Sequence, residues 1–162
     1  MHEITLTYSE SIIRQAVLGF WWRVIGLRFL IAFGGVAVGL GVLLSKGNDS
    51  WIVGVLASSL AMSIAFAVAM YFVHFRNSMQ KLRAMGERQA LLTASATEIS
   101  FSSGAGSATL PWSAVAEVWQ FETCWLLLLS KAQFVTLPLI DMNLEVQAFI
   151  LERVRNAGGK IS

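Results

Sequence analysis

Charged residues are scarce in this sequence, and their scarcity is the first guide to the class of protein. They make up 14% of the 162 residues, against about 25% in ordinary soluble chains. Hydrophobic residues reach 56%, where roughly 45–50% is usual. The net charge is only +2, with the 12 lysines and arginines spread along the chain, so no strongly cationic surface is predicted. The composition therefore predicts a protein that lies in a lipid membrane and does not bind nucleic acid.

The residue types that perform catalysis or bind metals are also few. Cys124 is the only cysteine, which excludes an intramolecular disulfide and fits a reducing compartment. His2 and His74 are the only histidines, and Asp49 and Asp141 are the only aspartates. A nucleophile needs a base and an orienting partner, and a metal needs several convergent ligands. We therefore predict no catalytic residues, no metal site, no cofactor and no enzymatic activity, with Cys124 as a small buried hydrophobe and His74 at the membrane interface.

Two long apolar runs predict a pair of transmembrane helices. Residues 51–75 contain no Asp, Glu, Lys or Arg, and residues 24–44 contain only Arg28, which can extend toward the lipid headgroups. At about 1.5 Å per residue, either run can cross roughly 30 Å of hydrocarbon. The connector between them is short, so the helices must be antiparallel neighbours. The predicted divisions are an N-terminal strand and short amphipathic helix (1–23), a first span (24–44), a connector (45–50), a second span (51–75), a basic juxtamembrane helix (76–88) and a C-terminal domain (89–162).

Basic residues near the two spans predict their orientation. Arg14, Arg23 and Arg28 precede or begin the first span, whereas the connector carries one lysine balanced by one aspartate. Four basic residues follow the second span: Arg76, Lys81, Arg83 and Arg88. Under the positive-inside rule both termini then lie in the cytoplasm. These four residues either contact anionic lipid or only fix the orientation. The first 23 residues lack the pattern of a cleaved signal peptide, so we expect the hairpin to be retained.

Small residues recur at helical spacing in both spans. Lipid gives helices little hydrophobic reason to associate, so close packing depends on such residues. Three interpretations stay open, namely packing within the hairpin, homodimerisation, and no special role. The candidate packing residues are Gly35 and Gly39 in the first span and Ala57, Ala61, Ala65 and Ala69 in the second.

Outside the spans, the pattern predicts a small α+β domain. Residues 2–8 alternate apolar and polar side chains, and the only sheet available to such a strand is in the C-terminal domain. Thr7 and Glu10 have the spacing of a capping box that would open a helix over 11–20. A last helix should begin near Asn143 and bury Val146, Phe149, Ile150 and Val154, with Glu145, Glu152, Arg153 and Arg155 exposed. Six strands are predicted, at 90–95, 98–102, 107–111, 116–121, 124–130 and 133–138, with at least two of Trp112, Trp119 and Trp125 in the core.

A series of landmarks follows residue 95: a strand at 97–101, a glycine-rich turn, the segment 110–115 centred on Trp112, a further strand at Val118 and Trp119, a leucine-rich strand at 126–129, a turn at 136–138 and the final helix. This order resembles the YcxB-like family of bacterial membrane proteins. The resemblance implies a multi-pass protein of the bacterial inner membrane. It also implies a pleckstrin-homology-like module, in which a curled antiparallel sheet is closed by one helix. It implies no activity and no established site residues.

Three classes of function remain. The leading hypothesis is a non-enzymatic membrane protein whose hairpin anchors a cytoplasmic interaction module, with the lipid bilayer and a protein as partners and a homodimer as a further possibility. The alternative is a small immunity protein that neutralises a membrane-acting toxin. An enzyme is the third, and it is disfavoured because the sequence shows no catalytic constellation.

Overall fold

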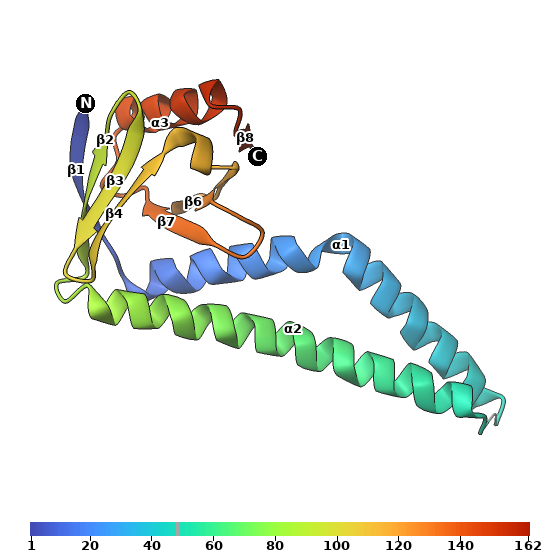
Figure 1. Cartoon of the computed structure of the whole chain (residues 1–162). Helices are drawn as coiled ribbons and strands as arrows, with labels where there is room; N and C mark the ends of the chain where they lie inside the picture. Colours follow the sequence, from blue (N-terminus) through green and yellow to red (C-terminus); the bar gives the residue numbers. More distant parts are fainter. Residues whose placement is uncertain (48) are drawn as a thin grey trace. The chain divides into compact units, whose positions relative to one another are not determined.

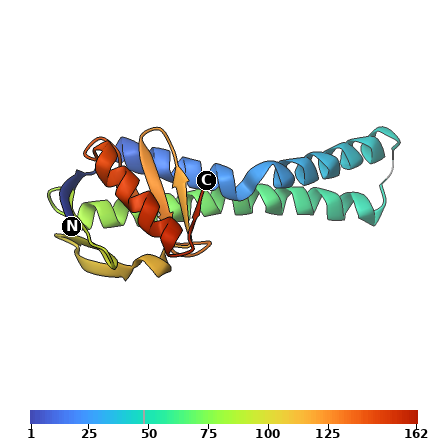
Figure 2. The ribbon, with the colours of Figure 1, turned by 90° about the horizontal axis from the view of Figure 1, so that it is seen from above.

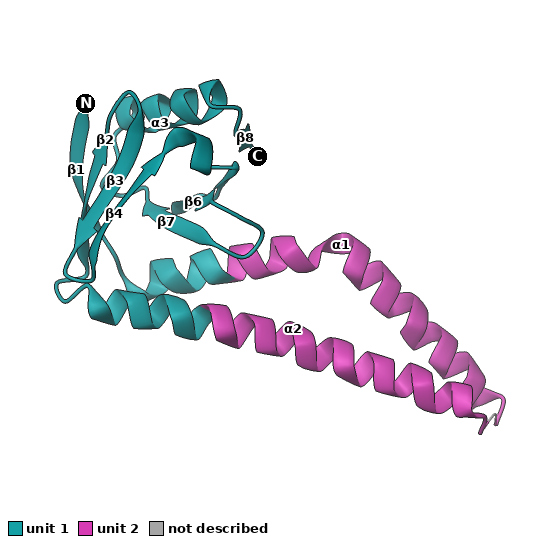
Figure 3. Ribbon diagram, in the orientation of Figure 1, with its two compact units in different colours: residues 1–17, 75–162 teal, residues 18–74 magenta. Residues whose placement is uncertain are grey.

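The computed structural model describes residues 1–47 and 49–162, so the predicted connector at 45–50 falls partly outside the described residues. The chain divides into two units, one formed by residues 1–17 and 75–162 and the other by residues 18–74 (Figure 3). The elements in order are β1 (His2–Thr7), α1 (Glu10–Ser45), α2 (Trp51–Ala84), β2 (Gln89–Ala94), β3 (Glu98–Ser103), β4 (Gly106–Pro111), a short 3₁₀ helix η1 (Trp112–Ala114), β5 (Glu117–Gln120), β6 (Cys124–Leu128), β7 (Phe134–Pro138), α3 (Leu144–Asn156) and β8 (Lys160–Ile161) (Figure 1).

The first sheet joins the N-terminal strand to the strands that directly follow the two long helices. Its strands have the order β1-β2-β3-β4, and every neighbouring pair is antiparallel. Strand β1 pairs with β2 from His2 opposite Ala94 to Thr7 opposite Gln89, so the predicted pairing of the N-terminal strand with the C-terminal sheet is confirmed. The alternation that predicted this strand buries Leu6 and, just beyond the strand, Tyr8. Burial of these apolar side chains is what fixes the segment on the sheet.

The second sheet has the order β7-β6-β5-β8, in which β8 lies parallel to β5. Helix α3 covers this sheet, as both views show (Figures 1 and 2). The prediction of a small antiparallel sheet domain with a C-terminal helix is therefore confirmed. The single curled sheet of a pleckstrin-like module is not found, because the described strands form two separate four-stranded sheets that do not close on each other. Side-chain alternation does not specify which strands pair, and so it did not predict the division.

The core of this unit is rich in tryptophan. Trp112, Trp119 and Trp125 are all buried, which confirms the prediction for at least two of them. The Nε1 of Trp112 donates to the backbone oxygen of Ser95 at 3.1 Å, so its polar atom is satisfied despite burial. The six predicted strands are all present. Strand β6 ends two residues before the predicted boundary, because Leu129 begins a turn in which its N–H donates to the Gln133 oxygen.

Helix α3 begins where the sequence predicts. Asn143 is its N-cap, and the Asn143 Oδ1 accepts the Val146 N–H at 2.9 Å. The helix buries Val146, Ile150 and Val154, as predicted. Two predictions are wrong. Phe149 was expected to be buried and Arg153 to be exposed, but both side chains are half-buried. The Arg153 guanidinium lies 4.9 Å from the centre of the Phe149 ring, so the two side chains shield each other through a cation–π contact.

The ends of the long helices differ from the prediction. The capping box at Thr7 is wrong, because Ser9 caps α1 and its Oγ accepts the Ile12 N–H at 3.2 Å. The Thr7 N–H instead donates to the Asp141 carboxylate at 2.6 Å, which holds the end of β1 in place. Helix α2 continues past the predicted second span and ends at Ala84, whereas the juxtamembrane helix was predicted to reach residue 88. Residues 85–88 connect α2 to β2.

The second unit consists of the two helices of the hairpin. Gly26 breaks α1 with φ 60° and ψ 169°, a conformation that a residue with a Cβ rarely adopts. On the N-terminal side of this break, the Trp21 Nε1 donates to the Ala67 backbone oxygen of α2 at 2.7 Å. Helices α1 and α2 are each long and apolar enough to cross a membrane, and their most apolar stretches bury nothing inside the protein. Two apolar helices of this kind fit a membrane protein.

Candidate functional site

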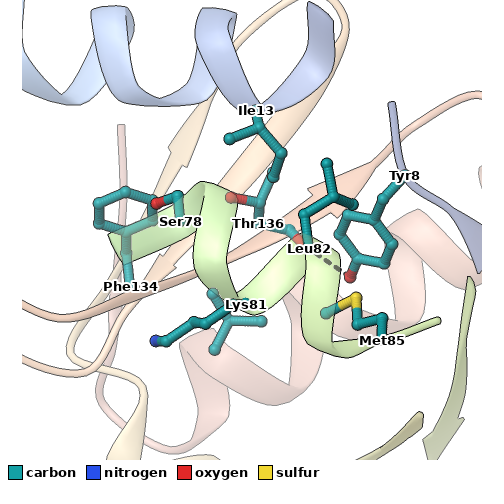
Figure 4. Close-up of a pocket in the computed structure, with 9 residues that line it drawn as sticks. Tyr8, Ile13, Ser78, Lys81, Leu82, Met85, Phe134 and Thr136 are labelled. Atoms are coloured by element: carbon teal, nitrogen blue, oxygen red, sulfur yellow. Dashed lines mark hydrogen bonds between the residues drawn. The ribbon is translucent and has the colours of Figure 1, made fainter. Parts of the chain in front are cut away.

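The first unit contains a half-open, largely apolar pocket of about 130 Å³ (Figure 4). The pocket lies where the start of α1, the end of α2 and strand β7 meet. It is lined by Tyr8, Ile13, Ser78, Lys81, Leu82, Met85, Phe134, Val135 and Thr136. An apolar cavity of about 150 Å³ is large enough to hold benzene. The volume therefore suits one apolar side chain or a group of similar size.

Local sequence explains how α2 reaches this pocket. Ser78, Lys81, Leu82 and Met85 are spaced at i, i+3, i+4 and i+7, so one face of the helix carries all four. Leu82 is buried, Ser78 and Met85 are half-buried, and Lys81 is exposed. The pocket thus has an apolar interior with a single cationic side chain among the residues that line it.

Tyr8 fixes the opposite side of the pocket. Its hydroxyl donates a hydrogen bond of 3.0 Å to the Thr136 backbone oxygen on the outer edge of β7. Burial raises the pKa of the Tyr8 phenol well above its ordinary value, and the nearby Asp141 carboxylate adds to the shift. The phenol therefore stays protonated and remains a donor, and it ties the N-terminal segment to the second sheet.

The basic residues predicted after the second span are not gathered at one place. Lys81 lines the pocket, whereas Arg76, Arg83 and Arg88 do not. All four side chains are exposed. The Arg88 guanidinium lies 3.5 Å from the Glu10 carboxylate, an ion pair between the start of α1 and the turn before β2. Whether any of the four contacts lipid stays a prediction.

The small residues singled out in the two spans have open space beside them in this structure. A Cβ placed on Gly35 or Gly39 would meet no atom within 4 Å. Phe29 and Val36 of α1 instead lie opposite Leu60 of α2 around a small cavity. The four predicted packing residues of α2 are all exposed: Ala57, Ala61, Ala65 and Ala69. Packing within the hairpin, homodimerisation and no special role all stay predictions for these residues.

The chemically reactive residues are dispersed. Cys124 is buried, and burial raises the pKa of its thiol, which disfavours the reactive thiolate. The His2 ring packs against Phe149 with 4.7 Å between ring centres, and the Asp141 carboxylate is bound to the Thr7 N–H. Within residues 1–47 and 49–162, no group of three His, Cys, Asp or Glu side chains could hold a metal ion.

Sequence reasoning missed the pocket itself. The spacing of Leu82 and Met85 could have indicated that the end of α2 packs on the domain, because these apolar residues lie three positions apart on one face of the helix. The contribution of Phe134 had no comparable signal, since it depends on which sheet edge faces the helix.

The fold and the pocket define the class of protein. It is an α+β unit with two sheets, and β1 and β2 of the first sheet are separated in sequence by two helices that are long and apolar enough to cross a membrane. Residues 95–152 match the family model described as YcxB-like protein, so the chain carries a YcxB-like segment, as the sequence resemblance indicated. The match runs from the turn before β3 into α3 and leaves out β1, β2 and the hairpin. No curated protein matches the chain, and no solved structure matches it.

Proposed function

We propose that this chain is a non-enzymatic, multi-pass protein of the bacterial inner membrane, whose hairpin anchors a cytoplasmic interaction module. The observation that carries the proposal is the pairing of β1 with β2 on either side of the hairpin, with Thr7 opposite Gln89. Strands paired in this way lie on the same side of any membrane. The chain between them must therefore cross the bilayer an even number of times, and it contains two helices able to do so.

Charge supports the cytoplasmic orientation of the paired strands. Arg14 and Arg23 precede the first span, and Arg76 and Lys81 follow the second, whereas Lys46 is the only basic residue near the connector. The positive-inside rule places such basic flanks in the cytoplasm. The exposed basic residues beyond the second span would then lie near anionic lipid, where each contributes about 1 kcal/mol of attraction.

The interaction module acts by binding a protein partner at the α1–α2–β7 pocket. Its volume of about 130 Å³ accepts one apolar side chain. Ile13, Leu82 and Met85 would remove that side chain from water, and burial of this kind contributes about 1.5–3 kcal/mol for a fully buried aliphatic or aromatic residue. Lys81 lines the pocket and can meet a carboxylate of the partner.

A pair of leucine substitutions tests this binding role. Ser78→Leu places an apolar side chain into the pocket, and Asn77→Leu places the same side chain on the exposed neighbouring position, which does not line it. The tagged full-length protein is purified in mild detergent, and its co-purifying proteins are identified by mass spectrometry. We expect a partner that is captured by wild type and Asn77→Leu and lost from Ser78→Leu. Equal capture by both variants would exclude the pocket as the binding site.

A further inference from the structure

Strand β4 is an edge of the first sheet, and its register shows which backbone groups point outward. The Trp112 N–H donates to the Thr97 oxygen, which sets the alternation along the β3–β4 pair. Ala108 and Leu110 therefore direct their backbone groups toward β3. Ser107 and Thr109 direct theirs away from the sheet. In the part of the chain that the structure describes, no partner reaches these outward N–H and C=O groups.

The other sheet edges are protected in ways that β4 is not. On β1, the outward N–H of Thr7 is bound by the Asp141 carboxylate. On β7, the Thr136 oxygen accepts the Tyr8 hydroxyl, and β8 has only two residues. Natural edges are commonly guarded by charge, cover or short length, because an open edge recruits another strand. Strand β4 is six residues long and carries no charge, and its residues 106–109 are all exposed.

We propose that β4 is a homodimer interface, at which the β4 strand of a second copy adds antiparallel about a twofold axis through Ala108. In this register Ser107 of one copy lies opposite Thr109 of the other. Both residues direct their backbone groups outward, so each such pair exchanges two hydrogen bonds. The register therefore satisfies the outward N–H and C=O groups of both residues in both copies.

The size and charge of the side chains and the register of the strands support a second copy as the occupant. The side chains at 107–109 are small, and β4 carries no charge that would be brought opposite its like. Ser107 would face Thr109 across the interface, and the same pairing of hydroxyls already occurs within the chain, where Ser100 Oγ and Thr109 Oγ1 lie 3.1 Å apart. If the twofold axis passed through Thr109, Ser107 of one copy would lie opposite Pro111 of the other. The Ser107 carbonyl would then have no hydrogen-bond donor, because proline has no N–H.

Disulfide trapping tests the interface in the full-length protein. At the twofold axis the two Ala108 residues form a non-hydrogen-bonded pair with about 4.5 Å between Cα atoms, which lies within the span of a disulfide. Ala108→Cys is compared with Ser102→Cys, which is also an exposed position. Ser102 lies on β3, so the interface would keep it too far from its copy in the second chain. Wild type is the background, since Cys124 is buried. Under mild oxidation in native membranes we expect a covalent dimer from Ala108→Cys and none from Ser102→Cys, and equal dimer from both would overturn the proposal.

Proline substitutions test whether the backbone of β4 makes the contact. Ser107→Pro and Thr109→Pro together remove the two outward N–H groups without removing a hydrogen bond to β3. Added to Ala108→Cys, they should abolish the covalent dimer. Protease resistance of the domain shows that the variant remains folded. Persistence of the dimer in a folded proline variant would also contradict the proposal, because another surface would then hold the copies together.

Discussion

Replacing Leu6 with alanine tests whether the N-terminal strand is a structural part of the C-terminal domain. Leu6 lies in β1, opposite Ala90 of β2, and its side chain is fully buried. Truncation of a buried leucine to alanine costs about 2–5 kcal/mol, and the upper part of that range applies where the site cannot collapse. Small domains have a total stability of about 5–15 kcal/mol, so the variant should fold but be measurably weaker. Thr5→Ala changes an exposed neighbour on the same strand and should cost less than about 1 kcal/mol.

The assay is proteolysis of the full-length protein in detergent across a urea series, read out as intact C-terminal domain. The free energy of unfolding is obtained by linear extrapolation to zero urea. Leu6→Ala should move the midpoint to lower urea while Thr5→Ala stays close to wild type, and deletion of residues 2–8 should move it furthest. If Leu6→Ala and Thr5→Ala had the same midpoint, β1 would contribute nothing to the domain, and the argument for an even number of membrane crossings would lose its basis.

Substitutions at three further positions probe the same unit. Trp112→Ala should lower the free energy of unfolding by about 3–5 kcal/mol, and Trp112→Phe by less, as measured by urea titration. Burial and Asp141 raise the pKa of Tyr8, so the folded state keeps a proton that the unfolded chain releases at about pH 10. Stability should therefore fall as the pH rises above about 10, and Tyr8→Phe should remove that part of the slope in melts across pH. Gly104→Ala should destabilise the domain in thermal melts, because the new Cβ would lie 2.5 Å from the Met85 backbone oxygen. A wild-type melting curve for Gly104→Ala would show that this close approach is wrong.

Much of the domain could be predicted because alternation reports directly on burial. The pattern of residues 2–8 showed a half-buried strand, and the absence of any other sheet identified its partner. Asn143 and the apolar positions after it defined α3 for the same reason. Alternation tells which side chains face inward but not how strands are grouped, so two sheets were mistaken for one curled sheet.

The spans and the pocket were harder to predict. When every face of a helix is apolar, periodicity cannot distinguish the face that meets a partner helix from the face that meets lipid. For that reason the alanines from Ala57 to Ala69 left three interpretations open, namely packing within the hairpin, homodimerisation and no special role, and in the structure the four predicted packing alanines are exposed. The break at Gly26 had no signal beyond one glycine among many, and the pocket depends on Phe134 and Leu82, which are distant in sequence and meet only in the fold.

The topology of the hairpin is the central claim, and fused reporters test it most directly. A reporter enzyme that is active only outside the cytoplasm is fused after residue 48 in one protein and after Ser162 in another. A fluorescent protein that matures only in the cytoplasm is fused at the same two positions as the matched control. The pairing of β1 with β2 and the basic flanks predict enzyme activity only after residue 48 and fluorescence only after Ser162. The same reporter active at both positions would contradict the account, because the two helices would not then form a hairpin across the membrane.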